Sequence, residues 1–236
     1  MQAFAPSFML SALNQQFDRA TPKTILRWAA QTYGESLAIV TSLQPTGIAT
    51  LHMLDEMRHE LDAFPHVLTV DTGLLFPETY ALIAEVEARF NIEIKRVRPQ
   101  HSVAQQSETH GEALWERNPD SCCNLRKVVP LAQALKGYSA WVAGLRRDQP
   151  GRESTPILSF DKKHKAVKLS PFANWDDDTL NVYIEMYDLP VNPLHAQGYP
   201  TIGCVTCTQP VVTGENSRAG RWVGHAKSEC GIHVQA

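Results

Sequence analysis

The stretch HVLTVDTGLLFPETYALIAEVEARFNIEIKRV, residues 66–97, decides the fold class. Its first six residues form a short apolar run that is typical of a buried strand. TGLLFP forms the loop that follows, and ETYALIAEVEARF has the length and apolar spacing of a helix. IEIKRV then supplies a second strand. This strand, helix, strand order predicts a parallel sheet that is covered by helices.

The same order extends in both directions along the chain. Upstream, Thr21 and Pro22 are suited to the N-cap and first position of a helix that Gly34 ends. The other elements that we expect are strands over 37–41 and 140–144, and helices over 48–61, 119–135 and 176–190, the last of them ended by Pro190. The expected fold class is therefore α/β, with a Rossmann-like, doubly wound, mostly parallel sheet.

The bulk composition indicates one globular domain over residues 1–236. Within it we expect an α/β core over about 17–195 and a loop-rich C-terminal segment over 196–236, which folds over the ligand crevice or stays mobile. The net charge of −3 argues against a general nucleic-acid binder. The sequence shows neither a secretory signal nor an apolar stretch of the roughly 18 residues that cross a bilayer. We therefore expect a cytoplasmic protein without a membrane partner.

Five cysteines are arranged as two pairs and a single residue. Cys122 and Cys123 are adjacent, Cys204 and Cys207 form a Cys-x-x-Cys pair, and Cys230 stands alone near the end. Two such pairs can supply four thiolates to one metal centre. Adjacent cysteines reach one centre only from a helix or a bend, which a cluster of several metal atoms tolerates better than a single zinc ion does. A structural zinc site and buried free thiols remain the alternatives.

Cys230 lies near Lys227 and His233, and neighbouring cations favour the reactive thiolate. A nucleophile on a mobile tail could reach a bound substrate and then meet a second protein. The alternative is an exposed cysteine that has no role.

Arginines and lysines gather in the loops expected around the crevice, where their side chains suit phosphate or sulfate oxygens. Lys127 follows Cys123 by one helical turn, so both lie on one face of the helix. The other cations of interest are Arg126, Arg146, Arg147, Arg152, Arg218 and Arg221. Three loops that follow strands, over 42–47, 71–77 and 145–155, are expected to meet at this crevice.

Six motifs in order resemble one known family. They are DTGLLFPET, SCCNLRKVVPL, GLRRDQPGRES, GCVTCTQPV, ENSRAGRW and ECGIH, and the resemblance runs from about residue 36 to residue 233. The family is that of the thioredoxin-dependent assimilatory sulfonucleotide reductases, in its iron-sulfur branch. The resemblance implies an adenine nucleotide α-hydrolase-like fold and reduction of adenylyl sulfate to sulfite.

The resemblance also implies roles for single residues. A 4Fe-4S cluster would be bound by Cys122, Cys123, Cys204 and Cys207. Cys230 would be the nucleophile, His233 would assist at the tail, and Lys127 would be a catalytic residue that binds the phosphosulfate. Thr72, Arg126 and Trp222 would lie near the cluster. The expected substrate-binding residues are Ser42, Asp71, Arg147, Arg152, Arg218 and Arg221.

Several points stay open at this level. The loop SLQPTG departs from the family's usual SFSGAED-like sequence, so 3′-phosphoadenylyl sulfate is an alternative substrate to adenylyl sulfate. An ATP-dependent sulfur transferase is a remote alternative, which the lack of an SGGxDS-like loop disfavours. The expected reductant is thioredoxin or glutaredoxin, and a homo-oligomer is possible.

Overall fold

A six-stranded sheet forms the centre of the computed structural model, which describes residues 7–212 and 214–233. The strands are β1 Leu37–Val40, β2 His66–Val70, β3 Ile94–Val97, β4 Ala140–Val142, β5 Leu158–Asp161 and β6 Ala166–Leu169. Their order in the sheet is β3-β2-β1-β4-β6-β5. All neighbours pair in parallel except β5 and β6, which form an antiparallel hairpin at one edge. The predicted α/β class is thereby confirmed.

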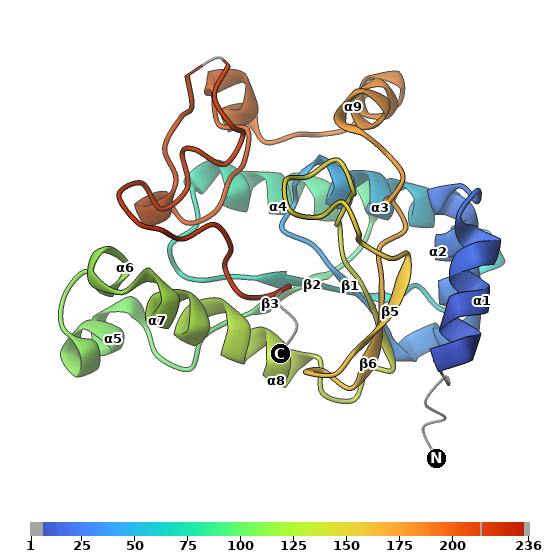
Figure 1. Ribbon diagram of the computed structural model, residues 1–236, viewed down its shortest axis with the longest axis horizontal. Coiled ribbons are helices and arrows are strands. Elements are labelled where there is room, and N and C mark those ends of the chain that lie inside the picture. The colour runs from blue at the N-terminus through green and yellow to red at the C-terminus, as the bar shows by residue number, and fades with distance from the viewer. Residues whose placement is uncertain (1–6, 213, 234–236) are drawn as a thin grey trace.

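Helices cover both faces of the sheet. The α-helices are α1 Ser7–Phe17, α2 Pro22–Tyr33, α3 Pro45–Glu56, α4 Pro77–Phe90, α5 Val103–His110, α6 Leu114–Arg117, α7 Pro119–Cys123, α8 Val129–Ala134 and α9 Asp177–Met186. In Figure 1, α3 and α4 lie on one side of the strands, and α5 to α8 lie on the other. This two-sided cover is what a parallel sheet needs, because both of its faces are apolar.

Successive side chains along a strand point into two different apolar cores, one on each face of the sheet. Ile39 of β1 packs with α2, α3 and α4 in the larger core, whereas Ala38 faces a smaller core that includes Leu131 of α8. Trp141 of β4 is fully buried in the smaller core. Residues next to one another on a strand point to opposite faces, so a short strand such as β1 serves both cores.

Most elements agree with the sequence-based prediction. Thr21 caps α2 as expected, since its side chain accepts a hydrogen bond from the Thr24 amide at 3.2 Å. The β5–β6 hairpin, α1, α5 and α6 were not predicted. The helix expected over 119–135 is interrupted by a π-helical turn, Asn124–Val128, and the last helix ends at Met186, ahead of Pro190.

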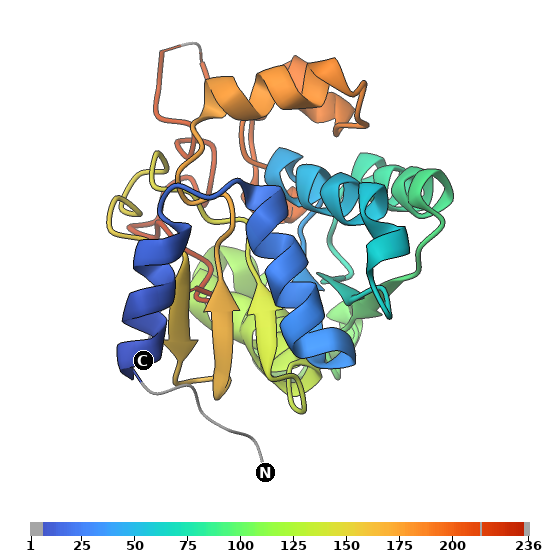
Figure 2. The same cartoon turned by 90° about the vertical axis from the view of Figure 1, so that its right-hand side faces the viewer.

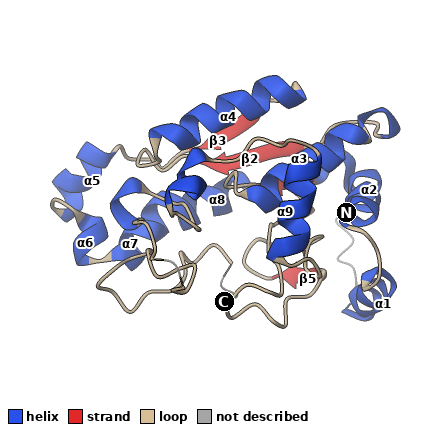
Figure 3. Ribbon diagram, turned by 90° about the horizontal axis from the view of Figure 1, so that it is seen from above, coloured by secondary structure: helices blue, strands red, loops and turns tan. Residues whose placement is uncertain are grey.

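The carboxyl ends of β1, β2 and β4 lie at one edge of the sheet, and the C-terminal segment covers that edge. Figure 2 shows this segment above the tips of the strands, and Figure 3 shows it between α7 and α9. Near the end of the described chain, Ile232 packs against the smaller core. Among the described residues, no helix is long and apolar enough to span a membrane.

Candidate active site

The adjacent cysteines lie at the end of a short helix that then widens. Asn118 caps α7 by accepting a hydrogen bond from the Ser121 amide at 2.9 Å, and both Cys122 and Cys123 are buried. The π-helical turn Asn124–Val128 follows directly. Such turns are rare in proteins, and those that occur are often found at functional sites. The widened turn changes the spacing between the cysteine pair and Lys127 from that of a regular α-helix.

The Cys-x-x-Cys segment is fixed to the loop after β2. The Val205 amide donates to the Leu74 carbonyl at 2.8 Å, and Cys204 forms an isolated antiparallel bridge with Leu75. The hydroxyl of Thr72, which is fully buried, lies 3.2 Å from Cys204 Sγ. These contacts fix Cys204 against a loop that lies about 130 residues earlier in the sequence.

Arg126 connects both pairs to the same loop. Its buried guanidinium donates to the Thr72 carbonyl at 2.6 Å and to Gln106 Oε1 at 3.0 Å, while Gln106 Nε2 lies 3.9 Å from Cys122 Sγ. Burial lowers the pKa of Arg126, and the nearby Cys122 and Cys204 act in the opposite direction. Thr72 and Arg126, which were expected near the cluster, thus both belong to the network of contacts around Cys204 and Cys122.

The four paired cysteines are free thiols that influence one another. None forms a disulfide in the described part of the chain. Burial raises the pKa of Cys123 to about 11 and also raises the pKa of Cys122 and of Cys207. Cys204 contributes electrostatically to the pKa of all three.

The donor set suits an iron-sulfur cluster. Thiolates are the usual ligands of such clusters, and hydroxyl, amide and guanidinium groups surround these sulfurs. The indole N–H of Trp222 is buried and lacks an acceptor among the described residues. The C-terminal arm, the segment after α9 that carries Cys207, thus holds a buried hydrogen-bond donor without a partner. Within 7–212 and 214–233, however, no three His, Cys, Asp or Glu side chains converge as they would around one metal ion.

Lys127 and Arg221 supply positive charge beside the sulfurs. Burial acts to lower the pKa of Lys127, but electrostatic interactions with nearby cysteine sulfurs outweigh burial and raise this pKa. The Arg221 guanidinium lies 4.5 Å from the centre of the Trp222 ring and donates to the Cys207 carbonyl at 3.3 Å. Burial and the neighbouring Arg218 lower the pKa of Arg221. Both cations therefore lie beside the cysteines, as the sequence indicated.

Cys230 is held in the same region on a docked tail. It is partly buried and close enough to affect the ionisation of Cys123, Lys127 and Arg221. Glu229, the residue before it, forms an ion pair with Arg152 at 3.1 Å. The Ser228 carbonyl accepts from Arg218 at 2.7 Å. Arg152 and Arg218, both expected at the crevice, thus contact the tail.

His233 lies deeper, on the smaller core. Its ring stacks on Trp141 with 5.8 Å between centroids and 7° between planes. Burial, with Lys168 and Arg152 nearby, holds the pKa of His233 well below its ordinary value, so the imidazole is neutral at physiological pH. In this conformation His233 anchors the end of the described chain.

Two other expected substrate residues are engaged elsewhere. Burial would raise the pKa of Asp71, but hydrogen bonds from Tyr80 at 2.7 Å, the Gly73 amide and Arg98 lower it. Asp71 thus fixes the turn after β2. Arg147 donates to the Thr155 carbonyl at 2.9 Å and also contacts Asp18 and Asn174.

The loop after β1 makes a tight turn into α3. Leu43 adopts a positive φ of 57°, and its amide donates to Thr41 Oγ1 at 3.0 Å. A Cβ at Gly47 would overlap that hydroxyl, so glycine is needed there. Ser42, the substrate residue expected in this loop, is exposed at the edge where the strands end.

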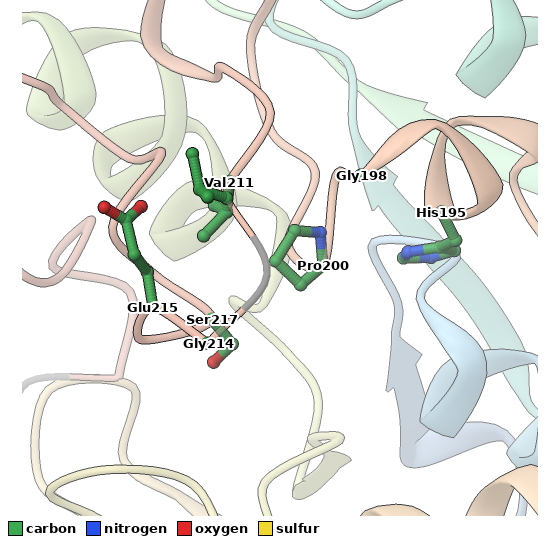
Figure 4. Close-up of a pocket in the computed structure, with 8 residues that line it drawn as sticks. His195, Gly198, Pro200, Val211, Gly214, Glu215 and Ser217 are labelled. Atoms are coloured by element: carbon green, nitrogen blue, oxygen red, sulfur yellow. The ribbon is translucent and has the colours of Figure 1, made fainter.

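A separate hollow of about 260 Å³ lies on the C-terminal arm (Figure 4). The described residues that line it are His195, Gly198, Pro200, Val211, Val212, Gly214, Glu215 and Ser217, and no cysteine is among them. The site described above therefore does not coincide with this hollow.

Known proteins share this arrangement of sequence and fold. The model of the phosphoadenosine phosphosulfate reductase domain matches residues 36–210. The chain belongs to the phosphoadenosine phosphosulfate reductase domain family. Within this reductase family, a relative from Salinibacter ruber named adenosine 5′-phosphosulfate reductase is 45% identical over 97% of this chain and 90% of its own. A relative from Gloeobacter violaceus named phosphoadenosine 5′-phosphosulfate reductase is 42% identical over 95% of this chain and 93% of its own.

A solved reductase structure agrees with the fold. The phosphate complex of phosphoadenylyl-sulfate reductase from Candida auris superposes with a TM-score of 0.77 and 27% identity, covering 89% of this chain and all of that one. The resemblance inferred from the six motifs is thereby confirmed as membership of the reductase family.

Sequence reasoning missed two residues that contact this site. Gln106 lies beside Cys122, and Lys163 Nζ donates to the Gly231 carbonyl at 3.4 Å. The capping box of Ser102 and Gln105 was a readable signal for α5, the helix that carries Gln106. No local signal pointed to Lys163, since its partner lies 68 residues away.

Proposed function

We propose that this chain is an assimilatory reductase that converts adenylyl sulfate to sulfite and AMP through a sulfonate on Cys230. One observation carries the proposal: Arg152 and Arg218 hold the residues just before Cys230, and the thiol is close enough to Lys127, Arg221 and Cys123 to interact with them electrostatically. The name of the relative that is 45% identical supports adenylyl sulfate as the substrate. The name of the relative from Gloeobacter keeps 3′-phosphoadenylyl sulfate as the second candidate.

The first step transfers the sulfonate group. The Cys230 thiolate attacks the sulfate sulfur of adenylyl sulfate, opposite the oxygen that joins sulfur to phosphorus. A new S–S bond forms, the S–O bond breaks, and AMP leaves with its electron pair. Lys127, Arg218 and Arg221 bind the phosphosulfate and stabilise the charge on the leaving phosphate. Arg152 lies beside them, where it contacts the tail.

The second step releases sulfite to a dithiol reductant of the thioredoxin or glutaredoxin class. A thiolate of the reductant attacks Cys230 Sγ, and sulfite leaves with the electrons of the S–S bond. The second thiol of the reductant then resolves the mixed disulfide and frees Cys230. The reductant therefore supplies both electrons. Because Cys230 is partly buried in the docked tail, the tail must open for this step.

Cys122, Cys123, Cys204 and Cys207 would hold a 4Fe-4S cluster. When bound, such a cluster supplies fixed charge and crosslinks α7 to the C-terminal arm. Arg126 and Thr72 orient the segments that carry the cysteines, and Lys127 lies between those cysteines and the anion. The free thiols also fit a reducing compartment, so we assign the protein to the cytoplasm.

The function is tested by an anaerobic assay with thioredoxin on both nucleotides, together with iron and sulfide analysis. We expect sulfite from adenylyl sulfate, and at a higher kcat/KM than from 3′-phosphoadenylyl sulfate. A higher kcat/KM on the phosphorylated nucleotide would replace the proposed substrate with the second candidate. Absence of sulfite from both nucleotides would contradict the function.

A glycine beside Arg221 gives a specific prediction. A Cβ at residue 203 would overlap the Arg221 guanidinium, which is the flexible end of a side chain and can move. We expect Gly203→Ala to fold normally but to bind adenylyl sulfate about 10-fold more weakly, since it displaces one charge-assisted contact. Isothermal titration in a Cys230→Ser background measures this affinity. Unchanged affinity would remove Arg221 from the anion site.

A further inference from the structure

The segment around Cys230 is anchored on both sides of the thiol. After it, Gly231 accepts from Lys163, Ile232 packs in the smaller core, and His233 stacks on Trp141. Before it, the contacts are polar and charged: Lys227 pairs with Asp120, and the Ser228 carbonyl accepts from Arg218. The thiol itself occupies the short span between the two anchors.

Among the contacts before the thiol, those of Glu229 are the nearest to it in sequence. Glu229 Oε1 lies 3.1 Å from an Arg152 guanidinium nitrogen, and its Oε2 lies 3.8 Å from Arg218. The Arg152 side chain is 17% exposed and that of Glu229 is 30% exposed, so the pair is partly shielded from water. Partial burial strengthens an ion pair relative to one on the open surface.

Arg152 belongs to the core, whereas Glu229 belongs to the tail. Arg152 follows Gly151 in the loop after β4, and its amide donates to the Gln149 carbonyl at 3.0 Å. This pair therefore joins a loop at the strand ends to the residue adjacent to the nucleophile. Small displacements of a reacting atom cost much rate, so a contact one residue from Cys230 is well situated to control the reaction.

We propose that Glu229 is a positioning residue, which Arg152 holds so that the Cys230 thiol is fixed beside Lys127 and Arg221. The inference rests on the proposed function for its kinetic consequence, but not for the contact itself. The proposal assigns Arg152 mainly to holding the tail, and not mainly to binding the phosphosulfate. The two roles separate in experiment, because a substrate ligand changes nucleotide affinity and a positioning residue changes the rate of the step.

The variants are Glu229→Gln, Arg152→Gln and the double variant. Glu215→Gln is the matched control, since Glu215 is an exposed carboxylate of the same arm. Iron content and thermal unfolding establish that each variant is folded. The first readout is the rate of Cys230 alkylation by iodoacetamide without nucleotide. We expect about 5-fold faster alkylation in both single variants, the scale of one partly exposed ion pair, and the parental rate in the control.

The second readout is single-turnover formation of the sulfonate adduct, with nucleotide affinity measured separately in a Cys230→Ser background. Both single variants should form the adduct about 10- to 100-fold more slowly, with affinity changed by less than about 3-fold. The double variant should be no slower than the slower single one, because one contact is lost in all three.

Two results would overturn the proposal. One is an unchanged alkylation rate in Glu229→Gln and Arg152→Gln. The other is a loss of nucleotide affinity in Arg152→Gln that accounts for its whole loss of rate, with Glu229→Gln like the parent. A parent protein that forms no adduct would instead contradict the proposed function, while the alkylation rates would still decide whether the contact holds the thiol.

Discussion

A Cys230→Ser variant is expected to lose sulfite formation by about 10⁴-fold or more while still binding adenylyl sulfate. The large loss follows because a serine hydroxyl neither ionises near neutral pH nor forms an S–S bond that a dithiol can reduce. Binding should persist, since the cations that would hold the anion come from outside residue 230. Sulfite release and isothermal titration with adenylyl sulfate measure the two properties.

The same variant controls for the other cysteines. Cys230→Ser should retain the parental content of iron and sulfide, because the proposed cluster uses the two pairs and not Cys230. Sulfite formation by this variant at a rate near that of the parent would remove Cys230 from its role. Loss of iron would instead mean that Cys230 is a ligand.

A Cys204→Ser variant is expected to lose most of its iron and about 100-fold or more of its activity. Cys204 lies at the centre of the site, since it contacts Thr72, bridges to Leu75 and acts on the ionisation of the other paired thiols. Loss of a thiolate ligand would open the site and free the arm that carries Arg221. Iron per chain and the thiolate absorption near 400 nm are the measurements, with Cys230→Ser as the matched control.

Two outcomes would contradict this expectation. If Cys204→Ser held as much iron as the parent, Cys204 would not be a ligand. If it lost its iron but kept its activity, the cysteine pairs would have no part in positioning Lys127 or the C-terminal arm.

The sequence predicted four of the strands: β1, β2 and β4 are short apolar runs between turns and helices, and β3, with Ile94 and Val97 buried, follows directly after the helix α4. The β5–β6 hairpin escaped prediction because its turn, KKHK, is charged and its strands carry polar residues such as Ser159 and Lys168. Lys168 is nevertheless buried, where its ammonium lies 5.1 Å from the centre of the Trp141 ring. The strand β6 is therefore stabilised by contacts with distant residues such as Trp141, and its local sequence pattern does not indicate it.

The candidate site was predictable where its residues occur in compact motifs, such as the two cysteine pairs and the residues around Cys230. For Asp71 and Arg147, which were expected to bind substrate, the structure shows contacts within the protein: Asp71 contacts Tyr80 and Arg98, and Arg147 contacts Asp18. These partners come from other segments, so no local pattern could indicate them. The π-helical turn after Cys123 likewise had no sequence signal beyond the paired cysteines.

The central claim is that Cys230, and no other residue, takes the sulfonate group. The most direct measurement mixes the parent protein with adenylyl sulfate in the absence of a reductant, digests it and locates the adduct by mass spectrometry. We predict one sulfonate on the peptide that contains Cys230, released as sulfite when thioredoxin is added. An adduct on Cys122, Cys123, Cys204 or Cys207, or turnover without any adduct, would contradict the account.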